Sequence, residues 1–125
     1  MLKGKKIAVV IPCYNEEKNI TKVIQTLPSY VDFIIAVDDN SSDNTYNILR
    51  SINIREKRIH IIKLDTNLGV GGAIDEGYGE ALKLKADLIA VMAGDGQMNP
   101  NELQILINYL LLKTADYAKI TRMYD

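Results

Sequence analysis

Short apolar runs rich in β-branched residues alternate along this chain with longer segments of helical periodicity. The runs are Ile7–Ile11, Phe33–Val37, Ile59–Leu64 and Leu88–Met92. The first of them, Ile7–Ile11, is a continuous, mostly β-branched run, as expected for a strand buried on both faces. Strands that alternate with helices join through crossovers into a parallel sheet with helices on both faces. The sequence therefore predicts an α/β fold with a three-layer, doubly wound and mainly parallel sheet.

The segments between these runs carry apolar residues three and four positions apart, which is the spacing of one helical face. We expect Pro12 to end the first strand and Pro28 the first helix. Asn99-Pro100 predicts the start of the last helix, because a capping side chain is followed by proline at the first helical position. We also expect a turn at Gly69–Gly72 and a fifth strand at Tyr117–Thr121.

The composition is that of one globular domain spanning residues 1–125, since 47% of the residues are hydrophobic and 25% are charged. The formal net charge of −1 gives no general attraction to nucleic acid. A single cysteine, Cys13, cannot form an internal disulfide and is interpreted as a small buried hydrophobe. The chain shows no cleavable signal and no apolar stretch long enough to span a bilayer, so we expect a soluble, cytoplasmic protein.

Polar residues gather just after three of the four expected strands. They are Pro12–Glu16, Asp38–Asp43 and Gly94–Gln97. In open parallel sheets, ligands bind beyond the carboxyl ends of the strands, where the strand order reverses. The three clusters therefore predict one ligand site at that edge of the sheet.

Part of this pattern has an ordinary structural explanation. Asn15, Asp43 and Asn99 can each cap the helix that follows, and Asp95 can serve a turn. Asp38 and Asp39 are harder to explain in this way, because adjacent carboxylates repel each other and only one can serve the local turn. A base or ribose that offers N–H or O–H groups would give the other carboxylate a partner.

The chain lacks the residues required by several common nucleotide-binding, zinc and catalytic sites. The glycine cluster at Gly69–Gly72 has neither the lysine and hydroxyl residue of a P-loop nor the GxGxxG spacing, so a Rossmann NAD site is disfavoured. His60 is the single histidine and falls within an expected strand, so it is interpreted as an ordinary strand residue. With one histidine, the chain lacks the residues for a zinc site built on several histidines, and a Ser-His-Asp triad is disfavoured.

Four segments, in order IPCYNEEKNI, VDDNSSDNT, NLGVGGAIDEGY and MAGDGQMNP, resemble family 2 glycosyltransferases of the GT-A fold. Among these enzymes, polyprenyl- or dolichyl-phosphate sugar synthases are the most similar. The resemblance covers nearly the whole chain but only the N-terminal, donor-binding portion of such domains. It implies a metal-dependent transferase that uses a UDP- or GDP-linked sugar, with a lipid phosphate as a candidate acceptor at the cytoplasmic face of the membrane.

The resemblance also implies which residues bind the donor. The family's PxYNE segment and second-strand aspartates hold the nucleoside, and its DxD segment holds the diphosphate with Mg²⁺ or Mn²⁺. Ala93 occupies the place of the first DxD aspartate, so Asp95 alone is assigned to the metal, and ligand oxygens and waters would complete the coordination. Arg122 is assigned to the donor phosphates. The assigned donor-binding set is Pro12, Tyr14, Asn15, Glu16, Asp38, Asp39, Asn67, Gly69, Gly94, Asp95, Gln97 and Arg122.

Two other hypotheses remain at this point. One is a nucleotide-sugar-binding domain without transferase activity of its own, because no general base is evident and the acceptor portion is missing. The other is a response-regulator-like domain, which is also a small doubly wound sheet but carries its acid pair after the first strand, where this chain has Pro12-Cys13-Tyr14. Self-association into a homo-oligomer is a further expectation, because an unpaired sheet edge favours it.

Overall fold

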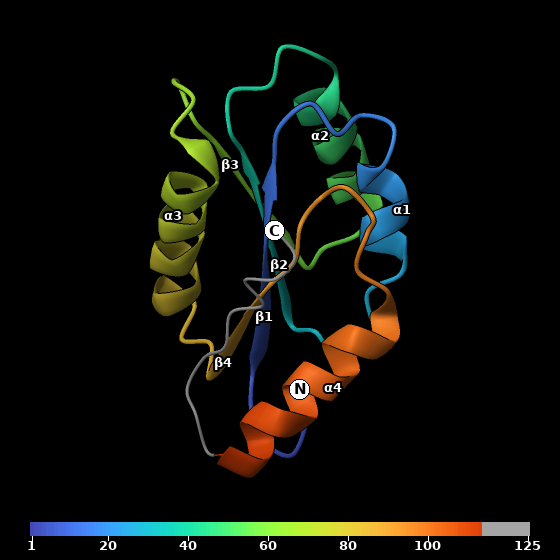
Figure 1. Cartoon of the computed structure of the whole chain (residues 1–125), viewed down its shortest axis with the longest axis vertical. Coiled ribbons are helices and arrows are strands. Elements are labelled where there is room, and N and C mark those ends of the chain that lie inside the picture. The colour runs from blue at the N-terminus through green and yellow to red at the C-terminus, as the bar shows by residue number, and fades with distance from the viewer. Residues whose placement is uncertain (114–125) are drawn as a thin grey trace.

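The structure, a computed structural model, describes residues 1–113. Within them, four parallel strands form one sheet in the order β3-β2-β1-β4 (Figure 1). The strands are β1 (Ile7–Cys13), β2 (Phe33–Asp38), β3 (Ile59–Lys63) and β4 (Leu88–Val91). The chain builds outward from β1 through β2 to β3 and then returns to place β4 on the other side of β1. The order therefore reverses between β1 and β4, which is where ligands bind in sheets of this kind.

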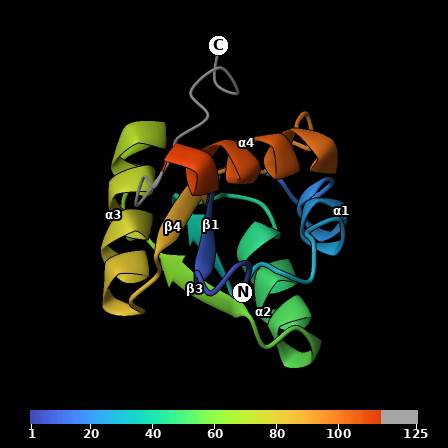
Figure 2. The same cartoon turned by 90° about the horizontal axis from the view of Figure 1, so that it is seen from below.

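Four helices cover the two faces of this sheet. They are α1 (Ile20–Gln25), α2 (Thr45–Arg55), α3 (Gly69–Lys83) and α4 (Pro100–Lys113). Helices α1, α2 and α4 pack on one face and α3 on the other (Figure 2). The expected three-layer, doubly wound parallel fold is confirmed. The fifth strand expected at Tyr117–Thr121 lies outside the described residues.

Strand β1 is the centre of the core, with all of its residues buried. Because side chains alternate along a strand, Ile7, Val9 and Ile11 pack toward α1, α2 and α4. Ala8 and Val10 pack toward α3 on the opposite face. This double burial explains the continuous apolar run in the sequence.

The expectation that Pro12 ends the first strand is wrong, since β1 continues to Cys13. Met92 donates its N–H to the Val10 carbonyl (2.9 Å), whereas Asp39 donates to the Cys13 carbonyl (2.8 Å). The backbone N–H and C=O groups of the even-numbered residues of β1 thus point toward β4, and the pairing with β4 ends at Val10. Pro12 lies beyond the ladder, where its missing N–H breaks no hydrogen bond.

The turn expected at Gly69–Gly72 is also wrong, because α3 begins at Gly69. Gly69 has a left-handed backbone, with φ 80°, but the two glycines that follow do not. An added Cβ at Gly72 would lie 2.6 Å from the Leu68 Cβ, so the absence of a side chain lets the first turn close. Glycine permits both turns and helices, and here packing against the sheet selects the helix.

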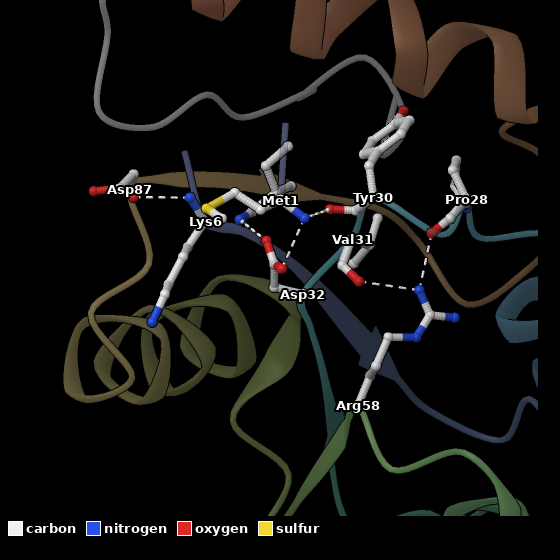
Figure 3. Close-up of polar contacts among 9 residues, drawn as sticks. Met1, Lys6, Pro28, Tyr30, Val31, Asp32, Arg58 and Asp87 are labelled. Atoms are coloured by element: carbon white, nitrogen blue, oxygen red, sulfur yellow. Dashed lines mark hydrogen bonds and ion pairs between the residues drawn. The ribbon is translucent and has the colours of Figure 1, made fainter. Parts of the chain in front are cut away.

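The opposite edge of the sheet, at the amino ends of the strands, is closed by its own polar side chains (Figure 3). Asp32 accepts the Ile7 N–H (2.7 Å), and Asp87 accepts the Lys6 N–H (2.8 Å). Arg58 donates to two carbonyl groups in the loop that follows α1, at 2.8 and 3.0 Å. Backbone groups at this edge therefore have side-chain partners within the chain.

The close approach of α3 to β1 generates a prediction about stability. An added Cβ at Gly77 would lie 2.3 Å from Val10 Cγ1, whereas one at Gly79 on the same helix would meet nothing within 4 Å. We expect Gly77→Ala to lower the free energy of unfolding by about 1–3 kcal/mol through overpacking. Gly79→Ala should raise it by about 0.5–1 kcal/mol through helix propensity. Urea denaturation of both variants tests this, and equal effects would contradict the packing argument.

Candidate functional site

A cleft of about 320 Å³ opens at the carboxyl ends of the strands, where the strand order reverses. It lies between the segments that follow β1, β2 and β4 and the first turn of α3. Its lining consists of Pro12, Cys13, Tyr14, Glu16, Asp39, Val70, Ala93, Gly94, Asp95 and Gln97. The three polar clusters of the sequence thus contribute to one cleft, as the strand-end argument predicts.

The adjacent aspartates after β2 have different environments. Asp38 is fully buried, does not line the cleft, and accepts the Ser41 N–H through Oδ1 (3.3 Å). Its Oδ2 is buried without a hydrogen-bond partner among the described residues. Asp39 lines the cleft and accepts the Leu68 N–H through Oδ1 (2.7 Å). Asp38 therefore serves the local turn, and the second oxygen of Asp39 has no hydrogen-bond partner among the described residues.

Asp95 stands at the end of β4 in a loop shaped by glycine. Its Oδ1 accepts the Gln97 N–H (3.0 Å), and Gly96 between them has φ 80°, which a side chain would strain. An added Cβ at Gly94 would lie 3.4 Å from Glu16 Cγ, so the ends of β4 and β1 face each other closely. The Asp95 carboxylate is half-buried at the cleft and is held by this turn.

The cleft is electronegative. Glu16, Asp39 and Asp95 contribute carboxylates to its lining, and no Lys or Arg among the described residues does so. A diphosphate would be repelled by such a lining unless a cation came with it. Oxygen donors of this kind suit Mg²⁺ or Mn²⁺. No three acidic, His or Cys side chains converge closely enough within residues 1–113 to hold a metal by themselves, so a metal here would need ligand oxygens as well.

Asn15 does not cap the following helix, which corrects one expectation. Helix α1 starts after Asn19, and the Asn15 Oδ1 instead accepts the N–H groups of Ser42 (2.9 Å) and Asp43 (3.3 Å) in the next loop. The Asn15 N–H donates to the Ser41 hydroxyl (2.9 Å). Asn15 has φ 54°, a left-handed conformation that asparagine tolerates better than most residues. It is outside the cleft lining and joins the two loops that carry the site.

Further hydrogen bonds join these same two loops. Thr45 Oγ1 accepts the Glu16 N–H (2.9 Å), Glu17 accepts the Asn44 N–H (3.2 Å), and Asp43 accepts the Glu17 N–H (3.3 Å). Asp43 also accepts the N–H of Thr45, the first residue of α2 (2.9 Å), although the N-cap position itself is occupied by Asn44. Desolvation acts to raise the pKa of Asp43, but the hydrogen bonds lower it overall. We call these contacts between residues 15–17 and 41–45 the loop latch.

The last helix begins as the sequence predicts. Asn99 Oδ1 accepts the Glu102 N–H (3.1 Å), so Asn99 caps α4. Asn99 does not line the main cleft.

Asn67 and Gly69 support the cleft from the segment that leads into α3. Asn67 donates to the Asp39 carbonyl (3.1 Å) and accepts the Gly69 N–H (3.2 Å), and neither residue lines the cleft. Val70, in the first turn of α3, does line it and was missed by sequence reasoning. Its signal was an isolated apolar residue within a glycine cluster. Arg122 lies outside the described residues.

Cys13 lies on the floor of the cleft and is almost fully buried. Its thiol donates to the Ile11 carbonyl (3.3 Å). Burial, with the nearby carboxylates of Asp38 and Glu16, raises the pKa of this thiol, so it stays protonated. Since the thiolate is the reactive form, the placement fits the interpretation of Cys13 as a buried hydrophobe.

Comparison with known proteins identifies the family. Residues 8–125 match the family Glycosyl transferase family 2. The chain belongs to this family, and its fold is that of GT-A glycosyltransferases. No helix within residues 1–113 has the length and apolar character needed to cross a bilayer.

Two curated relatives act on lipid phosphates, as their names state. UDP-N-acetylglucosamine–dolichyl-phosphate N-acetylglucosaminyltransferase of Methanococcus voltae is 34% identical over 132 residues, covering 95% of this chain and 53% of that protein. Undecaprenyl-phosphate 4-deoxy-4-formamido-L-arabinose transferase of Proteus mirabilis is 34% identical over 112 residues, covering 84% of this chain and 33% of that protein. The chain thus spans about half or less of the length of these relatives.

Solved structures share the fold. Residues 1–349 of TarS from S. aureus align with a TM-score of 0.68 and 23% identity, covering 86% of this chain and 32% of that chain. Glucosyl-3-phosphoglycerate synthase from Mycobacterium tuberculosis, in complex with Mn²⁺, UDP and phosphoglyceric acid, aligns with a TM-score of 0.63 and 22% identity. The alignment covers 86% of this chain and 39% of that synthase. At this identity the likeness shows the fold alone.

The loop latch generates a prediction about Asn15. Asn15→Gly keeps the left-handed backbone accessible but removes the bonds to Asn15 Oδ1, and should cost about 1–2 kcal/mol of unfolding free energy. Asn15→Ala should cost about 1 kcal/mol more, because alanine is strained at φ 54°. Asn15→Asp keeps both features and should stay closest to wild type. Urea denaturation ranks the three variants, and alanine more stable than glycine would refute the backbone argument.

Proposed function

We propose that this chain binds a nucleoside diphosphate sugar and forms the donor-binding part of a transferase that glycosylates a polyprenyl phosphate. The observation that carries the proposal is the carboxylate-lined cleft between β1 and β4, in a chain that belongs to glycosyl transferase family 2. The names of the relatives that act on dolichyl and undecaprenyl phosphate support the acceptor class.

The donor would lie across the cleft with its nucleoside toward β2. Asp39 has one carboxylate oxygen without a hydrogen-bond partner among residues 1–113, and a base N–H or ribose O–H supplies a donor for it. Tyr14 is exposed beside it and offers an aromatic face. Pro12 and Glu16 also line the cleft, next to Gly94 in the loop after β4, and the PxYNE resemblance implies that they contact the nucleoside.

The diphosphate would lie toward Asp95 and Gln97 at the end of β4. A bound Mg²⁺ or Mn²⁺ would neutralise the charge that develops on the departing diphosphate. Asp95 would hold this ion with diphosphate oxygens and waters, and the electronegative lining makes the cation necessary. The Mn²⁺ and UDP bound to the mycobacterial synthase of the same fold support this class of cofactor.

Transfer breaks the bond between the sugar carbon and the diphosphate oxygen and forms a new bond from that carbon to the acceptor. A lipid phosphate already carries an ionised oxygen at neutral pH, so it needs no general base. A sugar hydroxyl would need one. The choice of a phosphate acceptor is supported by the names of the relatives that act on dolichyl and undecaprenyl phosphate. An acceptor of this kind places the reaction at a membrane face.

The alternative is a domain that binds the nucleotide sugar without turning it over. The chain covers only 53% of its relative from Methanococcus voltae, and this observation favours the alternative for the chain tested alone. Turnover of UDP- or GDP-sugar with polyprenyl phosphate distinguishes the two hypotheses. Sugar-loaded lipid would rule out the binding-only alternative.

The proposed metal site after β4 generates a prediction about nucleotide binding. We expect UDP or GDP to bind more tightly with Mg²⁺ or Mn²⁺ and Asp95→Ala to remove this enhancement. Ala93→Asp should strengthen metal-dependent binding by roughly tenfold, because it adds a second carboxylate to a site that has one. Ala93→Asn adds similar bulk without charge and is the matched control. Titration calorimetry with and without metal measures all three, and an unchanged metal enhancement in Asp95→Ala would sink the assignment.

A second prediction concerns the nucleoside side of the cleft. Asp39→Ala should weaken nucleotide binding while leaving the metal enhancement intact, since Asp39 and Asp95 follow different strands. Asp39 also accepts the Leu68 N–H, so Asp39→Asn, which keeps an acceptor oxygen, is the variant less prone to disturb the loop. Calorimetry against free nucleosides and nucleotides reports the loss. Equal affinity of wild type and both variants would count against the assignment.

A further inference from the structure

Basic residues concentrate in one segment of this otherwise weakly acidic chain. Between Thr45 and Lys63 the sequence carries five Lys or Arg residues and one Glu, giving a formal charge of +4 in a chain whose net charge is −1. This segment forms α2 and β3. It lies at one lateral edge of the sheet, whereas the cleft lies at the carboxyl ends of β1 and β4.

Two of these five basic residues, Arg50 and Lys57, line an open groove beside α2 and β3. The groove measures about 590 Å³, and its lining includes Tyr46, Arg50, Ile54 and Lys57. These four residues recur at a spacing of three or four along the helix and the residues after it, so they share one side of it. We call this set the basic groove and include Lys63, which lies outside the lining but contacts the Tyr46 ring.

The cations of the basic groove form no ion pair with a carboxylate among residues 1–113. Arg50 Cζ and Lys63 Nζ lie 5.9 and 5.4 Å from the centroid of the Tyr46 ring, so two positive groups contact one aromatic ring. Among the described residues, neither these two cations nor Lys57 has a carboxylate within 4.0 Å. Like charges held together without a counterion indicate a surface that receives an anion.

The acidic residues nearby are already engaged. Glu56 pairs with Arg58 (2.7 Å), and Glu80 from α3 faces His60 at 3.9 Å. Glu80 is the one carboxylate among the groove-lining residues. It therefore offsets only part of the positive charge of Arg50, Lys57 and Lys63.

Ile54 distinguishes a membrane from a soluble anion. At 71% exposure it is the most exposed large apolar side chain among the residues that the structure describes, and it shares the groove with Arg50 and Lys57. An exposed isoleucine adds nothing to the binding of a small phosphate. At a bilayer, however, the same side chain can enter the boundary between headgroups and acyl chains while the flanking cations meet the headgroups.

We propose that the basic groove docks this chain on the surface of an anionic lipid bilayer, with Ile54 inserted and Arg50, Lys57 and Lys63 on the headgroup phosphates. Docking of this kind would hold the chain against the membrane that contains a lipid-phosphate acceptor. The inference does not require the donor cleft to be occupied. A failure of docking therefore leaves the proposed donor binding intact, and a failure of donor binding leaves docking intact.

The test is co-sedimentation of the chain, without nucleotide, with vesicles of phosphatidylcholine alone or mixed with phosphatidylglycerol. We expect binding to the mixed vesicles that weakens as salt is raised, and little binding to the neutral ones. The pair Arg50→Gln with Lys57→Gln should weaken binding roughly twenty-five-fold, at about fivefold for each cation lost. Ile54→Asn should weaken it severalfold.

Matched controls make the outcome decisive. Lys5→Gln with Lys83→Gln changes the net charge equally at exposed positions outside the groove and should leave vesicle binding near wild type. Equal loss in this pair would overturn the proposal, as would full binding by Ile54→Asn. Displacement from vesicles by soluble glycerol phosphate would show a free-phosphate site and overturn it too. Sedimentation velocity without vesicles covers the last alternative: a dimer abolished by Ile54→Asn, with no vesicle binding, would assign the surface to self-association.

Discussion

The burial of β1 on both faces and along both sides is the constraint on which the rest of this structure depends. Its side chains alternate between two cores, one shared with α1, α2 and α4 and the other with α3. Its backbone pairs with β2 on one side and with β4 on the other. Because β2 already occupies one side of β1, β4 can pair with β1 only on the other side. That placement creates the reversal at which the cleft opens.

Much of the fold could be predicted from the sequence because hydrophobic periodicity reports burial directly. The strand and helix order follows from the runs at Ile7, Phe33, Ile59 and Leu88. The errors fall where one residue type suits two conformations. Pro12 is tolerated in a strand because its ladder to β4 has already ended, and Gly69 can open a helix as readily as a turn. Pairing register and packing decide such cases, and neither is visible in a single segment.

The position of the candidate site could be predicted from the sequence, but the roles of its individual residues could not. Topology brings the segments after β1, β2 and β4 together, so the cleft could be expected from the order of elements. The contacts made by each residue could not be expected from that order. Asn15 points to a neighbouring loop, Asp38 turns inward, and Val70 enters the cleft from α3 because that helix starts one turn earlier than glycine content suggests. Each outcome depends on contacts between residues far apart in sequence.

The close contact between Gly77 and Val10 has a consequence at some distance from the core. Gly77 sets how near α3 lies to β1, and the first turn of the same helix supplies Val70 to the cleft wall. Helix α3 therefore contacts β1 at Gly77 in the core and lines the cleft at Val70 in its first turn. Substitutions that increase the distance between α3 and β1 at Gly77 will also shift Val70 and change the width of the cleft. Residues that never touch a ligand can thus affect which ligands fit.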